Sequence, residues 1–288
     1  MSDRFAMGPS TDLTGKVAVI SGATHDIGLA LALHAADRGM MVALADENEY
    51  LLAAALEQVK AKDVEAIAVH SEMLDFAALC ELARRSAAEL GPPWLVCNNP
   101  GVSIEVTLWG VINGVQVFAP DMVERDGGHI VNIAAAEVFG IRGAAPDVAI
   151  THAIVGLSES LYRELDSMGS RVGVTLVCPE LGKTNIASAP EYQNSVEPLM
   201  RYVPLNCLPP EEVADQIFAA VDARSFWFRP HMSSRMKCPG PAGPRGPGPH
   251  SAARSQIQRP PKQSGAHGAE EYCRFGVANH VTHLWKSQ

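Results

Sequence analysis

A glycine-containing turn near the start of the chain has the composition that a phosphate-binding loop needs. Residues 21–28 have the sequence SGATHDIG and connect an apolar run to a helical pattern. Glycine lets such a loop turn tightly, so that backbone N–H groups and a helix N-terminus approach a pyrophosphate. Gly22 and Gly28 are the two glycines of this loop. Their spacing predicts a dinucleotide site, and the alternative is a plain tight turn.

An acidic residue 18 positions after Gly28 favours the dinucleotide interpretation. Asp46 directly follows a second apolar run at residues 41–45. A carboxylate at this place can accept hydrogen bonds from both ribose hydroxyls, and it would repel a 2′-phosphate. We therefore expect NAD to be preferred over NADP. The alternative role of Asp46 is to cap the following helix.

The elements that must position these groups alternate along the chain. Short apolar runs are separated by helical patterns, which is typical of a parallel sheet covered by helices on both faces. Strands are expected at residues 16–21, 41–45, 65–69, 94–98, 129–134, 172–178 and 226–228, and helices at about 107–124, 150–165 and 211–223. The sequence predicts an α/β fold, a doubly wound parallel sheet (Rossmann-like) in a single domain over residues 12–230.

Charge and composition set this body apart from the tail. Residues 1–230 carry 15 Lys and Arg against 30 Asp and Glu, whereas residues 231–288 carry 8 against 2. An acidic body argues against nucleic acid as a partner. Nine of the thirteen residues from 238 to 250 are Gly or Pro, which prevents helix and strand. We expect a flexible N-terminus at 1–11 and a basic, Gly/Pro-rich, disordered tail at 231–288.

Several classes of protein are excluded by what the chain lacks. No apolar run approaches the roughly 18 residues of a membrane span, and the first residues have no apolar signal-peptide core. The six cysteines form no C-x-x-C pair, so neither a metal site nor a disulfide framework is expected. We expect a cytoplasmic protein without membrane contact.

Further segments, in a fixed order, make the chain resemble the short-chain dehydrogenase/reductase family. They are LTGK at 13–16, the glycine loop, NNPG at 98–101, GHIVN at 128–132, VGLS at 155–158, and CP at 178–179 leading to Thr184. The resemblance implies NAD(P)-dependent hydride transfer between a small alcohol and a carbonyl. It places Glu72 beside the adenine and Thr184 on the nicotinamide amide. The implied cofactor-binding residues are Gly22, His25, Asp26, Ile27, Gly28, Asp46, Glu72, Met73, Asn98, Gly101, Pro179 and Thr184.

The family's catalytic residues are all replaced. Its members use a Tyr-x-x-x-Lys pair, a Ser and usually an Asn; the aligned positions here are Asp147, Thr151, Ala135 and Thr107. No tyrosine in the chain is followed four residues later by lysine. Removing one acid/base group costs about 10² to 10⁴ in rate. We therefore expect a pseudoenzyme that is catalytically dead or severely impaired.

Three other departures concern the cofactor and substrate sides. Asp26 stands where the family has the middle glycine of the loop, and Glu180 stands where it has a glycine after Cys178-Pro179. Between Val102 and Thr107 about twenty family residues are missing, so that only residues 103–106 remain. A helix at 107–124 could still cross the sheet. We expect weakened cofactor binding and a damaged substrate wall and dimer surface.

Three alternatives stay open at this point. One is an active NAD-dependent oxidoreductase with an unusual proton donor, either His152 or a protonated Asp147. A second is a non-enzymatic scaffold subunit that forms a homo-oligomer or pairs with an intact paralogue through the helices around Trp109 and Leu157. A third is a degenerate gene product, since the tail residues Gly, Pro, Ala and Arg all have GC-rich codons, as out-of-frame translation of a GC-rich gene would give.

Overall fold

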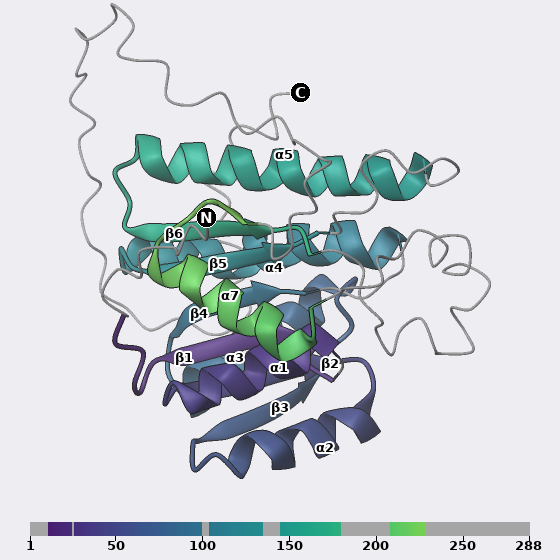
Figure 1. Cartoon of the computed structure of the whole chain (residues 1–288), viewed down its shortest axis with the longest axis vertical. Helices are drawn as coiled ribbons and strands as arrows, with labels where there is room; N and C mark the ends of the chain where they lie inside the picture. The colour runs from purple at the N-terminus through teal and green to yellow at the C-terminus, as the bar shows by residue number, and fades with distance from the viewer. Residues whose placement is uncertain (1–10, 25, 100–103, 135–144, 180–207, 229–288) are drawn as a thin grey trace, which may run out of the picture.

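Seven parallel strands form one sheet in the order β3-β2-β1-β4-β5-β6-β7 (Figure 1). The computed structural model describes residues 11–24, 26–99, 104–134, 145–179 and 208–228. The strands are β1 Val17–Ser21, β2 Met41–Asp46, β3 Ala66–His70, β4 Pro93–Asn98, β5 Gly128–Ile133, β6 Val172–Val177 and β7 Trp227–Phe228. The chain reverses its direction of winding between β1 and β4, where open α/β sheets bind their ligands.

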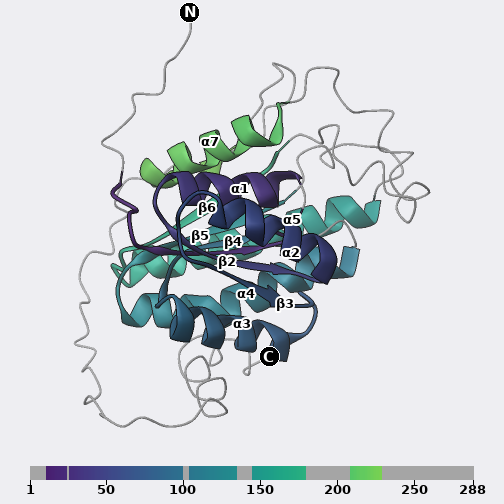
Figure 2. The ribbon, with the colours of Figure 1, turned by 90° about the horizontal axis from the view of Figure 1, so that it is seen from below.

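Six helices of the described residues cover the sheet in two layers (Figure 2). They are α1 Asp26–Asp37, α2 Glu49–Lys60, α3 Phe76–Glu89, α4 Ile104–Glu124, α5 Ala145–Ser167 and α7 Pro210–Asp222. Helices α1, α2 and α7 pack on one face, and α3, α4 and α5 on the other. The doubly wound fold that the sequence predicts is therefore confirmed.

The two faces of the sheet explain why its strands are apolar without alternation. Ala18 and Ile20 of β1 belong to the core beneath α1 and α7, whereas Val17 and Val19 belong to the core beneath α3 and α4. All five residues of β1 are buried. A strand that is covered on both sides needs apolar residues at every position, which is the pattern in the sequence.

The shortened segment before α4 leaves the topology intact. The helix begins at Ile104, three residues before the expected start at Thr107, and ends at Glu124 as expected. Its 21 residues span about 31 Å, which is enough to return across the sheet. Strand β5 accordingly pairs with β4 in parallel, with Leu95 opposite His129.

The first and last parts of the described body are joined by one arginine. Arg38, just after α1, donates from Nη1 to Asp222 Oδ2 at 3.2 Å and from Nη2 to the carbonyl oxygen of Thr11 at 2.8 Å. Asp222, the last residue of α7, also accepts a hydrogen bond from the Thr11 N–H at 3.1 Å. Helices α1 and α7 are therefore fastened side by side at one end.

Of the N-terminal segment 1–11 that we expect to be flexible, the structure describes only Thr11, whose N–H is bonded to Asp222. Residues 1–10 and the expected tail at 231–288 lie outside the described residues. Within the described ranges, no helix is long and apolar enough to cross a membrane. The same part of the chain contains no group of three or more His, Cys, Asp or Glu side chains placed to hold a metal ion.

Candidate functional site

The glycine loop closes tightly against the end of β4. Gly22 has a φ of +59°, and a Cβ at this position would lie 2.0 Å from the carbonyl oxygen of Asn99. Asn99 also donates from Nδ2 to the Gly22 carbonyl oxygen at 3.2 Å, and its N–H donates to Ser21 Oγ at 3.0 Å. Glycine is therefore required at position 22, because a side chain would push the loop off β4.

Asp46 holds the same loop from the side of β2. Its Oδ2 accepts hydrogen bonds from the N–H and the hydroxyl of Thr24, at 3.2 and 2.8 Å, and its Oδ1 accepts one from the Asn48 N–H at 3.1 Å. The residue is 9% exposed. Since each carboxylate oxygen has two lone pairs, Oδ1 can still accept a ribose hydroxyl. Thr24 is a site residue that the sequence did not single out.

The alternative role of Asp46, as the cap of α2, is wrong. The N-cap of that helix is Asn48, whose Oδ1 accepts a hydrogen bond from the Leu51 N–H at 3.0 Å. Asp46 lies two residues before that N-cap, and its carboxylate bonds to the loop at Thr24 through Oδ2 and to the Asn48 N–H through Oδ1.

Asp26 is the first residue of α1 and has a left-handed backbone, with a φ of +45°. This region is strained for a residue with a Cβ and is easily adopted by glycine, the family's residue at this position. A carboxylate at a helix N-terminus stabilises the helix, but it occupies the end that would attract a phosphate. Asp26 and Ile27 are both half-buried and lie beside the buried Gly28.

The residues that we expect beside the adenine follow β3 and lie next to Asp46. The Ser71 N–H donates to the Asp46 carbonyl oxygen at 3.0 Å, and Glu72 is exposed directly after it. Met73 is buried, and its carbonyl oxygen accepts a hydrogen bond from Asn113 Nδ2 at 3.2 Å. Ser71 Oγ is buried and has no hydrogen-bond partner among the described residues. The residues after β3 thus lie beside Asp46, and their contact with an adenine stays a prediction.

Asn98 has a different environment from the other expected cofactor residues. Its Nδ2 donates to Asn132 Oδ1 at 2.8 Å, and Asn132 Nδ2 donates to Ser158 Oγ at 3.0 Å. All three residues are at most 1% exposed. A Cβ on Gly114 would lie 2.0 Å from Asn98 Oδ1, so α4 is packed tightly on this side chain. The Asn98 side chain thus links β4 to β5 directly and to α5 through Asn132. It supports the site from inside the core.

Three of the four positions that the family resemblance aligns with the catalytic residues lie on helices, Thr107 on α4 and Asp147 and Thr151 on α5. Thr151, where the family has lysine, is 4% exposed on α5, four residues after Asp147 on the same helix. Thr107 is half-buried on α4. The one histidine beside these positions, His152, is exposed, and its Nδ1 is 2.7 Å from the Val148 carbonyl oxygen. The imidazole therefore lies away from the buried side of Thr151, as one helical step of about 100° predicts.

The remaining expected positions follow the strand ends. Pro179 is buried just after β6. His25, Gly101, Ala135, Glu180 and Thr184 lie outside the described residues.

The sheet order and the glycine loop at its switch point define a Rossmann-like dinucleotide fold. Residues 16–194 match the profile of the short chain dehydrogenases. The chain is 33% identical over 195 residues to SadH of Mycobacterium tuberculosis, whose name describes an oxidoreductase, covering 60% of this chain and 69% of SadH. It is 30% identical over 187 residues to 1-deoxy-11-beta-hydroxypentalenate dehydrogenase of Streptomyces avermitilis, covering 58% of this chain and 68% of that protein.

A solved structure agrees with these relatives. A short chain dehydrogenase/reductase from Burkholderia phymatum in complex with NAD superposes with a TM-score of 0.71 at 31% identity, covering 77% of this chain and 90% of that one. The protein belongs to the short-chain dehydrogenase/reductase family, as its motifs predict.

Proposed function

We propose that this protein binds NAD in preference to NADP and carries out the family's hydride transfer at a severely reduced rate or not at all. The observation that carries the cofactor half is the bonding of Asp46 to Thr24 across the loop. It places a buried carboxylate between the loop that would hold the pyrophosphate and the residues after β3 that would hold the adenine.

The charge around this point favours NAD. Asp46 and Glu47 are both acidic, and the loop from Ala23 to Asp26 contains no Lys or Arg to bind a 2′-phosphate. A phosphate dianion placed beside Asp46 would be repelled, whereas ribose hydroxyls would donate to it. A homologous family member was solved in complex with NAD, which supports the same choice.

We base the loss of proton transfer on the residues that stand at the positions of the family's proton-transfer groups. NAD, when bound, supplies the carbon that accepts or gives the hydride. A proton must move at the substrate oxygen, and in the family a tyrosine assisted by lysine moves it. A threonine at position 151 carries no positive charge to lower the pKa of a neighbouring acid, and Thr151 is a buried residue of α5.

Calorimetric titration of the full chain with NAD and NADP tests the cofactor proposal. We expect NAD to bind at least tenfold more tightly, and Asp46→Asn to reduce that ratio because the substitution removes the charge. Glu47→Gln, on the exposed neighbour, is the matched control and should keep most of the preference. Tighter binding of NADP than of NAD by the unmodified chain contradicts the proposal.

Absorbance at 340 nm tests the catalytic half separately. With NAD at saturating concentration, a panel of small alcohols should give no turnover, or turnover at least 10²-fold below that of an intact family member. Turnover at the family's ordinary rate would show that another group moves the proton.

A second role is supported by one exposed side chain. Trp109 on α4 presents a large apolar ring that is 53% exposed. We propose that α4 contributes to a contact between subunits, either of this chain or of an intact paralogue. Sedimentation of the chain, and of Trp109→Gln, with and without the paralogue would reveal this contact, and an unchanged monomer in all four cases excludes it.

A further inference from the structure

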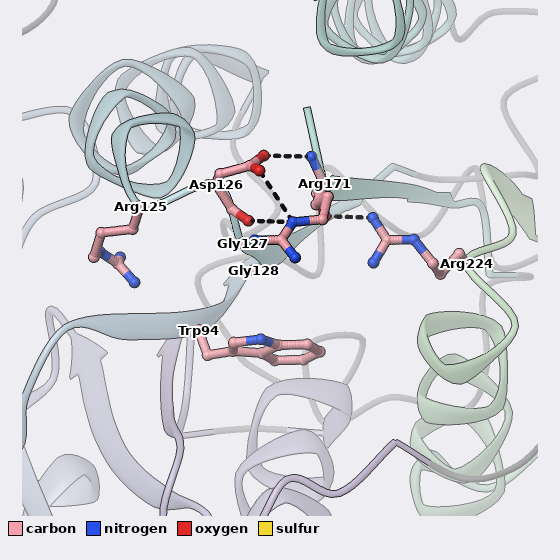
Figure 3. Close-up of a pocket in the computed structure, with 7 residues that line it drawn as sticks. All are labelled: Trp94, Arg125, Asp126, Gly127, Gly128, Arg171 and Arg224. Carbon is pink, nitrogen blue, oxygen red and sulfur yellow. Dashed lines mark hydrogen bonds and ion pairs between the residues drawn. The ribbon is translucent and has the colours of Figure 1, made fainter. Parts of the chain in front are cut away.

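A pocket of about 410 Å³ lies at the amino ends of β4, β5 and β6, at the opposite edge of the sheet from the glycine loop (Figure 3). Its lining residues are Trp94, Arg125, Asp126, Gly127, Gly128, Arg171 and Arg224. Three guanidinium groups thus meet one carboxylate. This excess of positive charge stands out in a body that has twice as many acidic as basic residues.

Asp126 is fully engaged by Arg171. The N–H of Arg171 donates to Asp126 Oδ1 at 2.8 Å, and its Nε donates to Oδ2 at 3.0 Å. The backbone hydrogen bond from Arg171 holds the pKa of Asp126 below its usual range, so the carboxylate stays charged. Among the described residues, the two terminal amino groups of Arg171 make no hydrogen bond. Figure 3 shows them directed toward the space above Trp94.

Arg224 occupies a backbone conformation that glycine would adopt more easily. It follows the C-cap of α7 at Ala223 and has a φ of +50°. Helices commonly end with glycine at such a position, since a Cβ is strained there. The Arg224 Nη2 donates to the carbonyl oxygen of Arg171, which brings the two guanidinium groups to one side of the pocket (Figure 3). Arg224, despite its strained backbone, therefore holds a second guanidinium group beside that of Arg171.

Arg125 and Trp94 line the rest of the pocket and are held by other contacts. Arg125 is neutralised by Asp121, at 2.6 Å, and also donates to the Pro93 carbonyl oxygen at 2.9 Å. Trp94 is half-buried at the floor of the pocket, and the Lys16 ammonium lies 4.4 Å from the centre of its ring. The pocket thus combines an aromatic surface with two arginines whose terminal groups face the opening.

We propose that this pocket binds a small oxyanion, a phosphate monoester or a carboxylate, that is carried on an apolar ring. Arg171 and Arg224 hold the oxyanion through charge-assisted hydrogen bonds, which are stronger than hydrogen bonds between neutral groups. The planar guanidinium group also makes these bonds directional. The indole of Trp94 contacts the ring. The pocket shares no residue with the glycine loop, so its ligand does not compete with the dinucleotide for the same contacts.

Phenyl phosphate, benzoate, inorganic phosphate and phenol are the probes that separate these contributions. The full chain is titrated with each by calorimetry, and the indole N–H signals of its four tryptophans are followed by NMR. We expect phenyl phosphate and benzoate to bind and to shift one indole signal, which Trp94→Phe removes. Inorganic phosphate should bind at least tenfold more weakly than phenyl phosphate because it lacks the ring, and phenol should not bind.

Arg224→Gly is the decisive variant, since it deletes one guanidinium and also relieves the left-handed backbone. We expect it to weaken phenyl phosphate binding at least tenfold while the melting temperature stays the same or rises. Arg163→Gln, an exposed arginine on α5 whose side chain is 67% exposed, is the matched control and should bind as the unmodified chain does. Equal affinity of Arg224→Gly and the unmodified chain, or binding of phenol as tight as that of phenyl phosphate, overturns the proposal.

Discussion

The backbone of Gly28 lies against the carbonyl group of Gly22 with no room for a side chain. A Cβ on Gly28 would stand 1.9 Å from the Gly22 oxygen and 2.8 Å from Asn99 Nδ2. This approach brings the first turn of α1 onto the loop that precedes it. The N-terminal end of the helix, with its partial positive charge, is thereby fixed at the place where a pyrophosphate would bind.

Gly28→Ala should therefore destabilise the fold and weaken NAD binding together. We expect a loss of about 1 to 3 kcal/mol in the free energy of unfolding, because the methyl group overpacks a rigid backbone contact. Gly156→Ala in α5 is the control, since a Cβ there meets nothing within 4 Å. That change should raise stability by up to about 1 kcal/mol, as alanine favours helix over glycine. Urea unfolding compares the two variants, and equal effects would refute the role assigned to the contact.

Asp26→Gly should tighten NAD binding. The substitution removes a carboxylate whose repulsion of a phosphate is at most about 4 kcal/mol at 4 Å and an effective dielectric constant near 20. Asp63→Gly is a matched control, because Asp63 also has a left-handed backbone, with a φ of +59°, but lies in the turn after α2. Calorimetry should show a gain for Asp26→Gly alone. Unchanged affinity in both variants would mean that the Asp26 carboxylate points away from the phosphates.

Acid should destabilise the protein through His129. Burial, and to a smaller extent the positive charge of Arg224, lower the pKa of this fully buried imidazole to about 3. Its Nε2 is 2.8 Å from Thr175 Oγ1. The Thr175 hydroxyl donates to the Ser225 carbonyl oxygen at 2.8 Å, so it must accept from the imidazole N–H. Protonation of the other ring nitrogen would add a buried charge with no partner among the described residues.

The sign of the effect follows from this depressed pKa. As the pH falls below about 6.5, the unfolded chain takes up a proton that the folded chain refuses until about pH 3. His129 alone should therefore remove about 1.4 kcal/mol of stability for each pH unit in that window. His129→Gln should flatten the dependence measured by urea unfolding between pH 6 and 4. The exposed His152→Gln controls for the loss of a histidine as such, and identical slopes in the unmodified chain and His129→Gln would contradict the prediction.

Restoring the four substituted groups should not restore ordinary activity. The variant carries Thr107→Asn, Ala135→Ser, Asp147→Tyr and Thr151→Lys. Proton transfer needs its donor within hydrogen-bond reach of the substrate oxygen, and a misplacement of about 1 Å can cost about 10²-fold in rate. Helix α4, which carries Thr107, begins only six residues after β4 ends, so we expect a damaged substrate wall and a misplaced residue 107.

Turnover of the quadruple variant with saturating NADH and reactive carbonyls measures this. A small recovery is expected, because reactive carbonyls need little positioning. Its melting temperature serves as the control for folding. Turnover at the family's ordinary level would show that the shortened segment is harmless and that the four substitutions alone silence the site.

The fold could be predicted because its signals are local. Apolar runs without alternation mark strands that are covered on both faces, and the strand bounds agree to within a residue. The bond between Thr24 and Asp46 could not be predicted in the same way. It depends on the parallel pairing that sets Ser21 of β1 opposite Ala45 of β2, which brings the two strand ends together.

The direction in which the Asn98 side chain points could not be predicted from the sequence, for a related reason. In a half-exposed strand, alternation shows which residues face inward, but β4 is buried along nearly its whole length. Nothing in the sequence then tells whether Asn98 faces a ligand or Asn132. The arginine pocket could not be predicted from the sequence either, because Arg171 and Arg224 lie 53 positions apart. The two residues meet only in the fold, where the end of α7 lies beside the start of β6.

The contact between α1 and α7 through Arg38 and Asp222 can form only after α7 has been synthesised on the ribosome. Helix α1 is made early, yet the helix that covers one of its sides ends 185 residues after Asp37. At about 5 to 20 residues per second, that side of α1 stays in water for roughly 10 to 40 s of synthesis. The nascent chain therefore carries an uncovered apolar surface while these 185 residues are made, and this interval is when chaperones would bind it.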